Sequence, residues 1–237
     1  MRIISIDIGM NNFAAITNNI GKEPNLIRGK TLKAENQWYN KITQPLRQQL
    51  KQAYDIEQRE KLSYNINKLA KQTIEHIFEY FWSVSEWIIT YCIENRIDTL
   101  LIGQYKMLVR KDYVTIPYGY FYSLLETKCA YHNIKFVRVN ERYTSGTSFF
   151  DGEPPTKEFY NKERRIYKHL WKCNNGECVN ADVNDSYQIM RKVYPQLFDN
   201  GVEGYLKDPK VIDIKIGKDK GDVKKWTQRN LKENWIN

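Results

Sequence analysis

One short run near the beginning of the chain, Arg2–Gly9, constrains the fold more than any other stretch. Its isoleucine-rich pattern predicts a buried β-strand, and Gly9 follows where the chain must turn closely. Asp7 is a carboxylate inside this apolar strand, and such a charge is costly unless it is paired or binds a cation. Because ligands of open α/β sheets gather at the carboxyl ends of strands, Asp7 is a candidate metal ligand. An aspartate that only caps a turn is the alternative.

Composition and charge narrow the class of protein. Hydrophobic residues make up 41% of the 237 positions, which is enough for a substantial core. Lys and Arg number 37 against 28 Asp and Glu, and this excess favours a polyanionic partner, although ordinary soluble surfaces carry it as well. No apolar run reaches membrane-spanning length, and no signal peptide precedes the first strand. The four cysteines, Cys92, Cys129, Cys173 and Cys178, do not follow the pattern of a secreted disulfide framework. We therefore expect a cytoplasmic protein with no membrane partner.

Hydrophobic periodicity predicts the order of the elements. Helical spacing predicts a long helical stretch broken near Asp55, a helix that opens at Pro117 and a last helix that ends before Pro195. The predicted strands are 2–9, 13–17, 26–29, 99–103 and 134–139. This order predicts an α/β protein with a mixed five-stranded sheet, flanking helices and an inserted surface subdomain, which is the order of the ribonuclease H-like fold.

Four short motifs occur in register along the chain: Ile6–Asn12, Asn36–Asn40, Tyr143–Ser145 and Asn180–Asn184. Together they resemble the transposon-encoded TnpB (OrfB) family, whose nuclease domain is of the RuvC type. The resemblance extends from Arg2 to about Val193. It implies a transposition-linked, magnesium-dependent nuclease that acts on DNA under the guidance of a transposon-derived RNA, so DNA and a guide RNA are the implied partners.

The resemblance also implies a division of the chain. Residues 1–145 are expected to form the RuvC-like core, with a long helical insertion at about 37–95. Residues 146–179 show little periodicity and are expected to be an inserted loop region, a remnant of a zinc ribbon. Residues 180–200 would form the final core helix, and 201–237 a basic and flexible tail rich in Lys, Asp and Gly.

Two aspartates match catalytic positions of the family. Asp7 matches its first catalytic carboxylate, and Asp182 matches its last, at the start of the final helix. Two-metal phosphodiester hydrolysis needs carboxylates from several elements around ions roughly 3.5–4 Å apart. Mg²⁺, or Mn²⁺ in its place, prefers such oxygen ligands. Taken by itself, Asp182 is better explained as a helix N-cap, and the paired motifs reverse that preference in favour of a metal ligand.

The second family carboxylate is missing from its usual place at the end of the fourth strand, where this chain has Gly103. Glu141 is the candidate, because it follows the neighbouring strand, expected about 4.8 Å away, and a glutamate side chain can cross that gap. Glu126 is the runner-up. If neither fills the place, the alternative is a cleavage-dead or truncated TnpB-like protein that binds nucleic acid. A structural subunit that works only with a partner chain is a third alternative.

The chain departs from the family in two further ways. Relatives often carry two Cys-x-x-Cys pairs in the inserted region, but only Cys173 and Cys178 remain here, and Ser148–Asp151 has no cysteine. Structural zinc needs four ligands, so a plain loop is favoured over zinc. Relatives also place a wedge and recognition module before the nuclease domain. Since this sequence begins at the first strand, the resemblance implies a truncated product, a fragment, or dependence on a separate chain for that module.

Basic and aromatic residues flank the predicted site. Tyr113, Tyr118 and Tyr120 are candidates for stacking on bases. The candidates for contacts with a phosphate backbone are Lys106, Arg110, Lys111, Lys162, Arg164, Arg165 and Lys168. Each of them alone is better explained by a solvated charge or a core-edge aromatic, but as clusters they favour a nucleic-acid partner.

Overall fold

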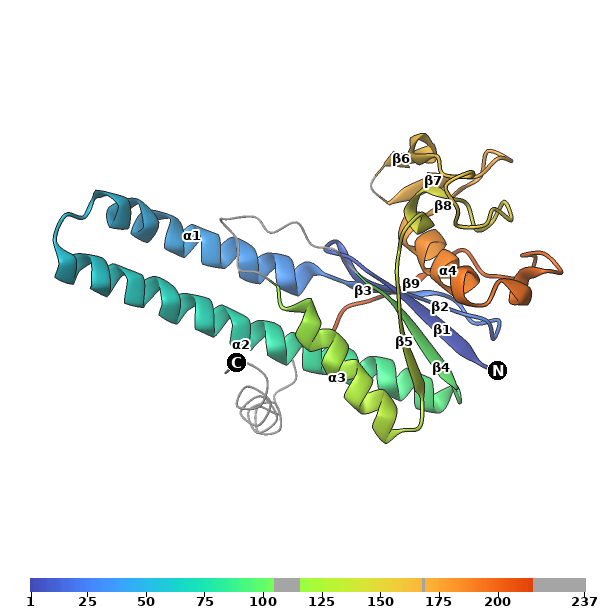
Figure 1. Ribbon diagram of the computed structural model, residues 1–237, viewed down its shortest axis with the longest axis horizontal. Coiled ribbons are helices and arrows are strands. Elements are labelled where there is room, and N and C mark those ends of the chain that lie inside the picture. Colours follow the sequence, from blue (N-terminus) through green and yellow to red (C-terminus); the bar gives the residue numbers. More distant parts are fainter. Residues whose placement is uncertain (105–115, 168, 215–237) are drawn as a thin grey trace. The chain divides into compact units, whose positions relative to one another are not determined.

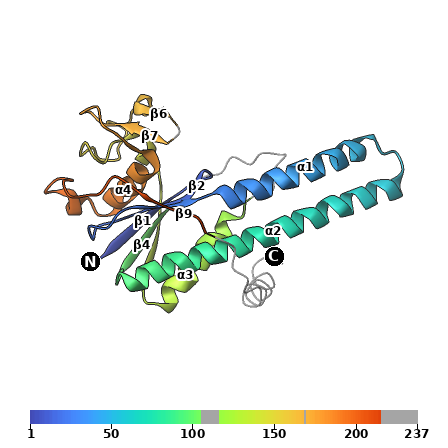
Figure 2. The same ribbon diagram turned by 180° about the vertical axis from the view of Figure 1, so that it is seen from behind.

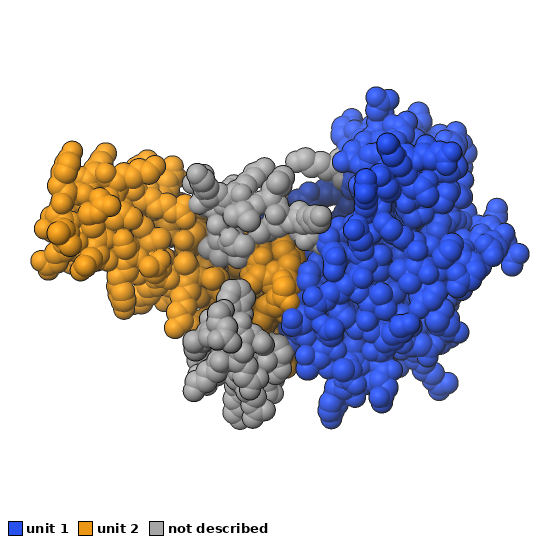
Figure 3. Space-filling model, in the orientation of Figure 1, with its two compact units in different colours: residues 1–29, 87–106, 122–213 blue, residues 30–86, 107–121, 214–237 orange. Residues whose placement is uncertain are grey.

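The structure is a computed structural model that describes residues 1–104, 116–167 and 169–214. The chain divides into two compact units, shown in two colours in Figure 3. Unit 1 comprises residues 1–29, 87–106 and 122–213, and unit 2 comprises residues 30–86, 107–121 and 214–237. The residues with candidate metal-binding roles all belong to unit 1.

Unit 1 is built on a six-stranded mixed sheet (Figure 1). Its strands lie in the order β5-β4-β1-β2-β3-β9. Strand β2 is antiparallel to β1 and β3, whereas β4 is parallel to β1, β5 to β4 and β9 to β3. The bounds are β1 (Ile3–Ile8), β2 (Asn12–Asn18), β3 (Asn25–Arg28), β4 (Thr99–Gly103), β5 (Lys135–Val139) and β9 (Lys210–Ile212). The predicted ribonuclease H-like arrangement of the first five strands is confirmed.

The sixth strand, β9, was not predicted from the sequence. Its three residues pair in parallel with β3, in the register Leu26 with Val211. They lie in a stretch rich in Lys, Asp and Gly that reads as a tail, and three residues are too few to show the alternation that marks a strand. Without β9, β3 would be the edge strand of the sheet, and its backbone N–H and C=O groups on that side would be unpaired. Residues 210–212 become a strand because they pair with these groups.

Helix α4 (Ala181–Val193) covers one face of the sheet, and the part of α3 (Tyr118–Tyr131) in unit 1 lies on the other (Figures 1 and 2). Small hydroxyl side chains let α4 approach the sheet closely. Ser186 Oγ donates to the Ser5 carbonyl at 2.8 Å and lies 2.9 Å from Thr17 Oγ1, and all three residues are fully buried. The Phe149 and Tyr187 rings stack at 4.5 Å and extend the core along α4.

The inserted region forms a second, three-stranded sheet, β6-β7-β8, all antiparallel. Its strands are β6 (Arg165–Tyr167), β7 (Leu170–Lys172) and β8 (Cys178–Asn180). Trp171 is fully buried at its centre and packs with Cys173, Val179 and Ala181. The sequence shows little periodicity here because these strands are only three residues long.

Unit 2 contains α1 (Lys30–Gln52) and most of α2 (Ile56–Glu94), whose last residues, 87–94, belong to unit 1. Asp55 separates the helices, and its Oδ2 accepts a hydrogen bond from the Gln58 N–H at 2.9 Å, which caps the start of α2. Phe81 of α2 packs against Tyr118 and Phe121 of α3, with ring centroids 6.4 and 5.1 Å apart. None of the described helices combines the length and apolar character needed to cross a membrane.

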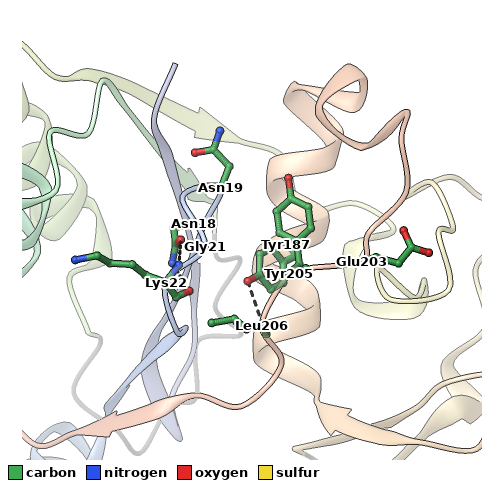
Figure 4. Close-up of a pocket in the computed structure, with 9 residues that line it drawn as sticks. Asn18, Asn19, Gly21, Lys22, Tyr187, Glu203, Tyr205 and Leu206 are labelled. Atoms are coloured by element: carbon green, nitrogen blue, oxygen red, sulfur yellow. Dashed lines mark hydrogen bonds between the residues drawn. The ribbon is translucent and has the colours of Figure 1, made fainter.

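A small pocket of about 220 Å³ lies in unit 1, between the turn that follows β2 and the segment after α4 (Figure 4). Tyr187 and Tyr205 form part of its wall, and the Tyr187 hydroxyl donates to the Leu206 carbonyl at 3.1 Å. The other lining residues are Asn18, Asn19, Gly21, Lys22, Glu203 and Gly204. The pocket contains none of the candidate metal ligands.

Candidate active site

Three aspartates meet at one edge of the unit 1 sheet. Asp7 comes from β1, and Asp182 and Asp185 come from the start of α4, three residues apart and hence on one helix face. Each offers a carboxylate oxygen, and these oxygens all lie within 4.8 Å of one another. Like charges at this separation repel, so the ionised cluster needs a compensating cation.

The strand register explains the position of Asp7. Strand β1 continues to Ile8, and Asp7 is paired with Ala15 of β2, so Asp7 belongs to the ladder and does not serve as a turn cap. On the other side, Ile6 is paired with Ile102 of the parallel strand β4, which ends one residue later. Asp7 therefore lies at the carboxyl ends of two central strands.

The N-terminus of α4 explains the position of Asp182. Asn180 is the N-cap of this helix, and its Oδ1 accepts hydrogen bonds from the N–H groups of Asp182 at 3.0 Å and Val183 at 3.1 Å. Since Asn180 fills the capping role, the Asp182 carboxylate is available for other contacts. Its Oδ2 accepts a hydrogen bond from Asn12 Nδ2 at 2.8 Å. Both asparagines belong to motifs on which the family resemblance rests.

Glu141 lies against Gly103. Strand β5 ends at Val139, which is paired with Gly103, and Glu141 follows two residues later. A Cβ atom on Gly103 would collide with the Glu141 carboxylate, and with Oε1 first. This oxygen is buried and has no hydrogen-bond partner within the described part of the chain. The Glu141 carboxylate thus occupies the space next to the last residue of the fourth strand.

Glu126 lies in a different environment. Its Oε2 is 2.5 Å from Arg138 Nη2, and 56% of its side chain is exposed. A carboxylate in an exposed ion pair of this kind is an ordinary surface feature. Glu141 is close enough to Asp7 for its charge to act on that aspartate, whereas the group of carboxylate oxygens within 4.8 Å of one another consists of Asp7, Asp182 and Asp185. The role of Glu141 as a ligand stays a prediction.

The electrostatics of the cluster differ from those of an ordinary surface. Burial raises the pKa of Asp7 well above its usual value, and the charges of Asp185, Glu141 and Asp182 raise it further, whereas Arg165 lowers it. Burial and the Asp185 charge raise the pKa of Glu141 to about 7. The pKa of Asp185 is also raised to about 7, mainly by burial, against the lowering effect of Arg165. After burial, the negative charge of neighbouring carboxylates is the cause that the raised pKa values of these three acids share.

Arg165 and His169 of the inserted region contact the cluster. Arg165 Nη1 lies 3.0 Å from Asp185 Oδ2, and its Nη2 lies 3.0 Å from Asp182 Oδ1. His169 Nδ1 lies 3.6 Å from Asp182 Oδ2, and its Nε2 lies 3.1 Å from Asn11 Nδ2. One guanidinium therefore faces several carboxylates, and the compensation is incomplete.

Sequence reasoning missed Asp185 and the role of Arg165. Asp185 follows the motif Asn180–Asn184 directly, and the spacing of three from Asp182 on a predicted helix was a usable signal. Arg165 was expected to contact phosphates, but its contact with two carboxylates depends on how β6 packs beside α4. No local pattern in the sequence encodes that packing.

The other candidates for nucleic-acid contact have varied positions. Lys106, Arg110, Lys111, Tyr113 and Lys168 lie outside the described residues. Tyr118 is buried, and the Tyr120 ring stacks on Phe78 at 4.0 Å, so these two tyrosines contribute to the core of unit 2. Lys162 is exposed, with its ammonium 5.7 Å from the Tyr160 ring. Among the described candidates, only Lys162 presents an exposed charge.

Arg164 forms a clasp with the acids of the preceding loop. Its guanidinium pairs with Asp151 and, at 2.6 Å, with Glu153, while its Nε donates to the Lys172 carbonyl at 3.1 Å. The guanidinium carbon also lies 5.2 Å from the Trp171 ring centroid. We call Arg164, Asp151 and Glu153 the Arg164 clasp. Its side chains are only 9–18% exposed, so the expected phosphate contact of Arg164 is not available.

The inserted region does not fit a four-ligand zinc site. Cys173 is buried, and its sulfur is 4.0 Å from Ser148 Oγ, whereas Cys178 is exposed. Asp151 is paired with Arg164, and its Oδ1 accepts from the Asn174 N–H at 3.0 Å. The place that a ligand pair from residues 148–151 would take is therefore used by hydrogen bonds and the Arg164 clasp.

The order and pairing of the strands define a ribonuclease H-like fold. Two family models match the sequence: OrfB_IS605, a probable transposase, over residues 2–108, and the Cas12f1-like TNB domain over residues 118–189. The expected resemblance to the TnpB (OrfB) family is confirmed by these two matches. Among curated proteins, the sequence comparison finds no match.

Solved structures share the fold. The chain aligns with the Cas12f1 protein of a Cas12f1–sgRNA–target DNA complex at 22% identity and a TM-score of 0.53. It aligns with a chain of a CRISPR-Cas12f ternary complex at 20% identity and a TM-score of 0.58. Each alignment covers 79% of this chain, but only 49% and 38% of the two relatives. The chain therefore spans at most about half the length of these relatives.

Proposed function

We propose that the chain is a divalent-metal-dependent DNA endonuclease linked to transposition, with Asp7, Glu141 and Asp182 as catalytic metal ligands and Asp185 beside them. The single observation that carries the proposal is the position of Glu141. Its carboxylate fills the space beside Gly103, close enough to Asp7 and Asp185 for their charges to interact. In this proposal Glu141, which follows the neighbouring strand β5, takes the place of the family carboxylate that is missing at Gly103.

The residues of the cluster fit a divalent cation. Carboxylate oxygens are the ligands that Mg²⁺ and Mn²⁺ prefer. The Glu141 Oε1 atom is buried and unpaired within the described residues. Burial, and after it the charge of the neighbouring acids, raise the pKa values of Asp7 and Glu141, and a bound cation would offset both effects. Bound metal ions would supply an activated water and stabilise the charge that develops on the leaving oxygen.

The chain's own residues have distinct roles in this proposal. Asp7, Glu141 and Asp182 hold the cations from three elements, β1, the segment after β5 and α4. Asn12 fixes the rotamer of Asp182 through its hydrogen bond. Arg165 partly neutralises the aspartates, and its planar guanidinium is suited to contact a scissile phosphate at the same edge.

A nucleic-acid partner is supported by charge and by the surface of the inserted region. The net charge is +9, although the candidate site is acidic. Exposed aromatic and apolar side chains gather in this region together with exposed lysines, a combination suited to stacking and phosphate contact: Phe159, Tyr160, Ile166, Tyr167, Leu170, Lys157, Lys162 and Lys172. DNA affinity should therefore fall steeply as salt rises.

The relatives suggest how DNA would be selected. The Cas12f1 structure is a complex with an sgRNA and target DNA. We extend this to a guide RNA for the present chain, and to a separate chain as one possible source of the wedge and recognition module. Both parts of the proposal concern the protein in its assembly, while the metal site can be tested on this chain alone.

The test compares two glutamate variants in a DNA-nicking assay with Mg²⁺ or Mn²⁺. Glu141→Gln is expected to lose metal-dependent cleavage while keeping its affinity for DNA, since it removes a charge without changing the shape of the side chain. Glu126→Gln is the matched control, because Glu126 belongs to an exposed ion pair. Equal cleavage by Glu141→Gln and the wild type would remove Glu141 from the site.

A cleavage-dead nucleic-acid-binding protein is the second candidate function. Gly103 favours it, because the usual acid at the end of β4 is absent. Arg165 favours it as well, because a guanidinium already contacts two of the carboxylates. This candidate predicts strong, salt-dependent DNA binding that divalent metal does not alter, and no nicking by the wild type under any metal condition.

A further inference from the structure

Lys192, in the last turn of α4, holds the segment that carries Glu141. Its ammonium donates one hydrogen bond to the Asn140 carbonyl at 2.8 Å and another to the Arg142 carbonyl at 2.7 Å. These carbonyls belong to the two chain neighbours of Glu141. Burial lowers the pKa of Lys192, and the charge of Arg142 lowers it further. The hydrogen-bond partners of the Lys192 side chain are carbonyl oxygens, which carry no formal charge.

The remaining contacts of this segment also fix the backbone. The Glu141 carbonyl accepts from the Thr144 N–H at 3.1 Å and from Thr144 Oγ1 at 2.8 Å. The Arg142 N–H donates to Asn140 Oδ1 at 2.8 Å. Three consecutive carbonyls, of residues 140–142, are therefore held, whereas the Glu141 Oε1 atom has no partner in the described chain. The backbone on both sides of the Glu141 side chain is thereby fixed.

Glu141 needs such support for two physical reasons. It lies beyond the end of β5, so the sheet ladder, whose last pair is Gly103 with Val139, does not fix its backbone. In addition, the carboxylate lies among aspartates whose negative charge repels it, and this repulsion favours displacement of the segment into solvent. A contact from outside the sheet is required to oppose that displacement.

Helix α4 is suited to this task because it also carries Asp182 and Asp185. Ten residues separate Asp182 from Lys192, or about 15 Å along a rigid helix. Helix α4 thus carries Asp182 and Asp185 near its first turn, and through Lys192 in its last turn it binds the segment around Glu141. The distance between Glu141 and the aspartates is set by a single stiff body.

We infer that Lys192 is a positioning residue for Glu141: by binding the Asn140 and Arg142 carbonyls, it keeps the Glu141 carboxylate in the metal site. This inference rests on the proposed function, because it gives Lys192 an effect on metal binding. It predicts that loss of the ammonium weakens the metal site without removing a ligand. Residues that orient metal ligands typically contribute about 10- to 100-fold to metal affinity.

The test is a double-substitution cycle read out by Mn²⁺ titration calorimetry on the whole chain, with the metal-free melting temperature as a check of folding. The variants are Lys192→Met, Glu141→Gln and the combination of both. Lys207→Met is the matched control, because Lys207 pairs with Glu177 on the surface. If Lys192→Met does not fold, Lys192→Gln replaces it, since an amide can still donate to one carbonyl.

The expected result is that Lys192→Met weakens Mn²⁺ binding about tenfold and adds nothing in the Glu141→Gln background, while Lys207→Met binds as the wild type does. Additive losses from Lys192→Met and Glu141→Gln would overturn the inference, and so would unchanged Mn²⁺ binding by Lys192→Met. Failure of the proposed function looks different: the wild type itself would bind no Mn²⁺, or Glu141→Gln would bind it normally.

Discussion

Two adjacent arginines of the inserted region each face a pair of acids, but the two pairs differ in surroundings. Arg164 contacts Asp151 and Glu153, and backbone N–H groups of Asn174 and Ser148 donate to the same carboxylates. Arg165 contacts Asp182 and Asp185, beside the further acids Asp7 and Glu141. Arg164 and the backbone donors together satisfy two acids, whereas Arg165 faces more carboxylates than its single charge can balance.

This difference separates a structural ion pair from a candidate metal site. In the Arg164 clasp the guanidinium and the backbone donors satisfy both acids, so there is no need for a further cation. At the acidic cluster the Arg165 guanidinium cannot balance four carboxylates. Burial first, and then the negative charge of the neighbouring acids, raise the pKa values of Asp7, Glu141 and Asp185. The burial of the acids and their number relative to the described cations together distinguish the two regions.

Among these changes, Asp7→Asn in the acidic cluster should have the largest effect, and the quantity affected is the rate of DNA cleavage. We expect DNA cleavage to fall about 10³-fold or more, since loss of a ligand removes several kcal/mol of transition-state stabilisation. The fold should be retained, and the metal-free melting temperature should rise or stay the same, because a repelled buried charge is removed. Nicking assays and thermal melting with and without Mg²⁺ measure both effects. An active Asp7→Asn protein would remove Asp7 from the site.

Replacing each arginine in turn should separate the two regions. Arg164→Ala leaves two poorly exposed acids without their cation, and we expect a loss of about 2–4 kcal/mol in unfolding free energy that Mg²⁺ does not restore. Arg165→Ala should also destabilise the metal-free protein, but here Mg²⁺ should restore most of the loss. Denaturant unfolding with and without Mg²⁺ measures both variants. If Mg²⁺ changed the unfolding free energy of Arg164→Ala and Arg165→Ala by the same amount, the distinction between a structural ion pair and a metal site would be contradicted.

The pH dependence of stability should show a smaller effect. Folded-state pKa values near 7 for Glu141 and Asp185 lie above those of an unfolded chain, so the folded state binds more protons between about pH 4 and pH 7. Metal-free stability should therefore fall as pH rises through this window, and the stabilisation by Mg²⁺ should grow in parallel. Melting curves across the window, with Asp7→Asn as the reference, test this sign.

Sequence reasoning captured the features that local patterns encode. The isoleucine-rich strand around Asp7, the strand that ends at Gly103 and the start of the last helix at Asp182 are each recognisable within a few residues. The ribonuclease H-like order and the resemblance to the family were therefore predictable, and both are confirmed. The proximity of Glu141 to Gly103 followed from the expectation that their strands are neighbours.

The features that sequence reasoning missed depend on packing between distant segments. The opposite roles of Arg164 and Arg165 arise where one short strand begins, and no periodicity distinguishes the two residues. Strand β9 exists because β3 offers a free edge, and the sheet of the inserted region is built from strands of three residues. The catalytic roles of Asp7, Glu141 and Asp182 stay predictions.

The most direct measurement of the central claim, that Glu141 supplies the acid missing at Gly103, is Mn²⁺ titration of a reciprocal swap. Glu141→Gly should lose most Mn²⁺ affinity, and adding Gly103→Glu to it should recover affinity to within about tenfold of the wild type, because the acid returns to the same space. Gly103→Glu alone should fold poorly, since its side chain would collide with the Glu141 carboxylate. If Glu141→Gly binds Mn²⁺ as tightly as the wild type, or if the swap recovers nothing, the claim is contradicted.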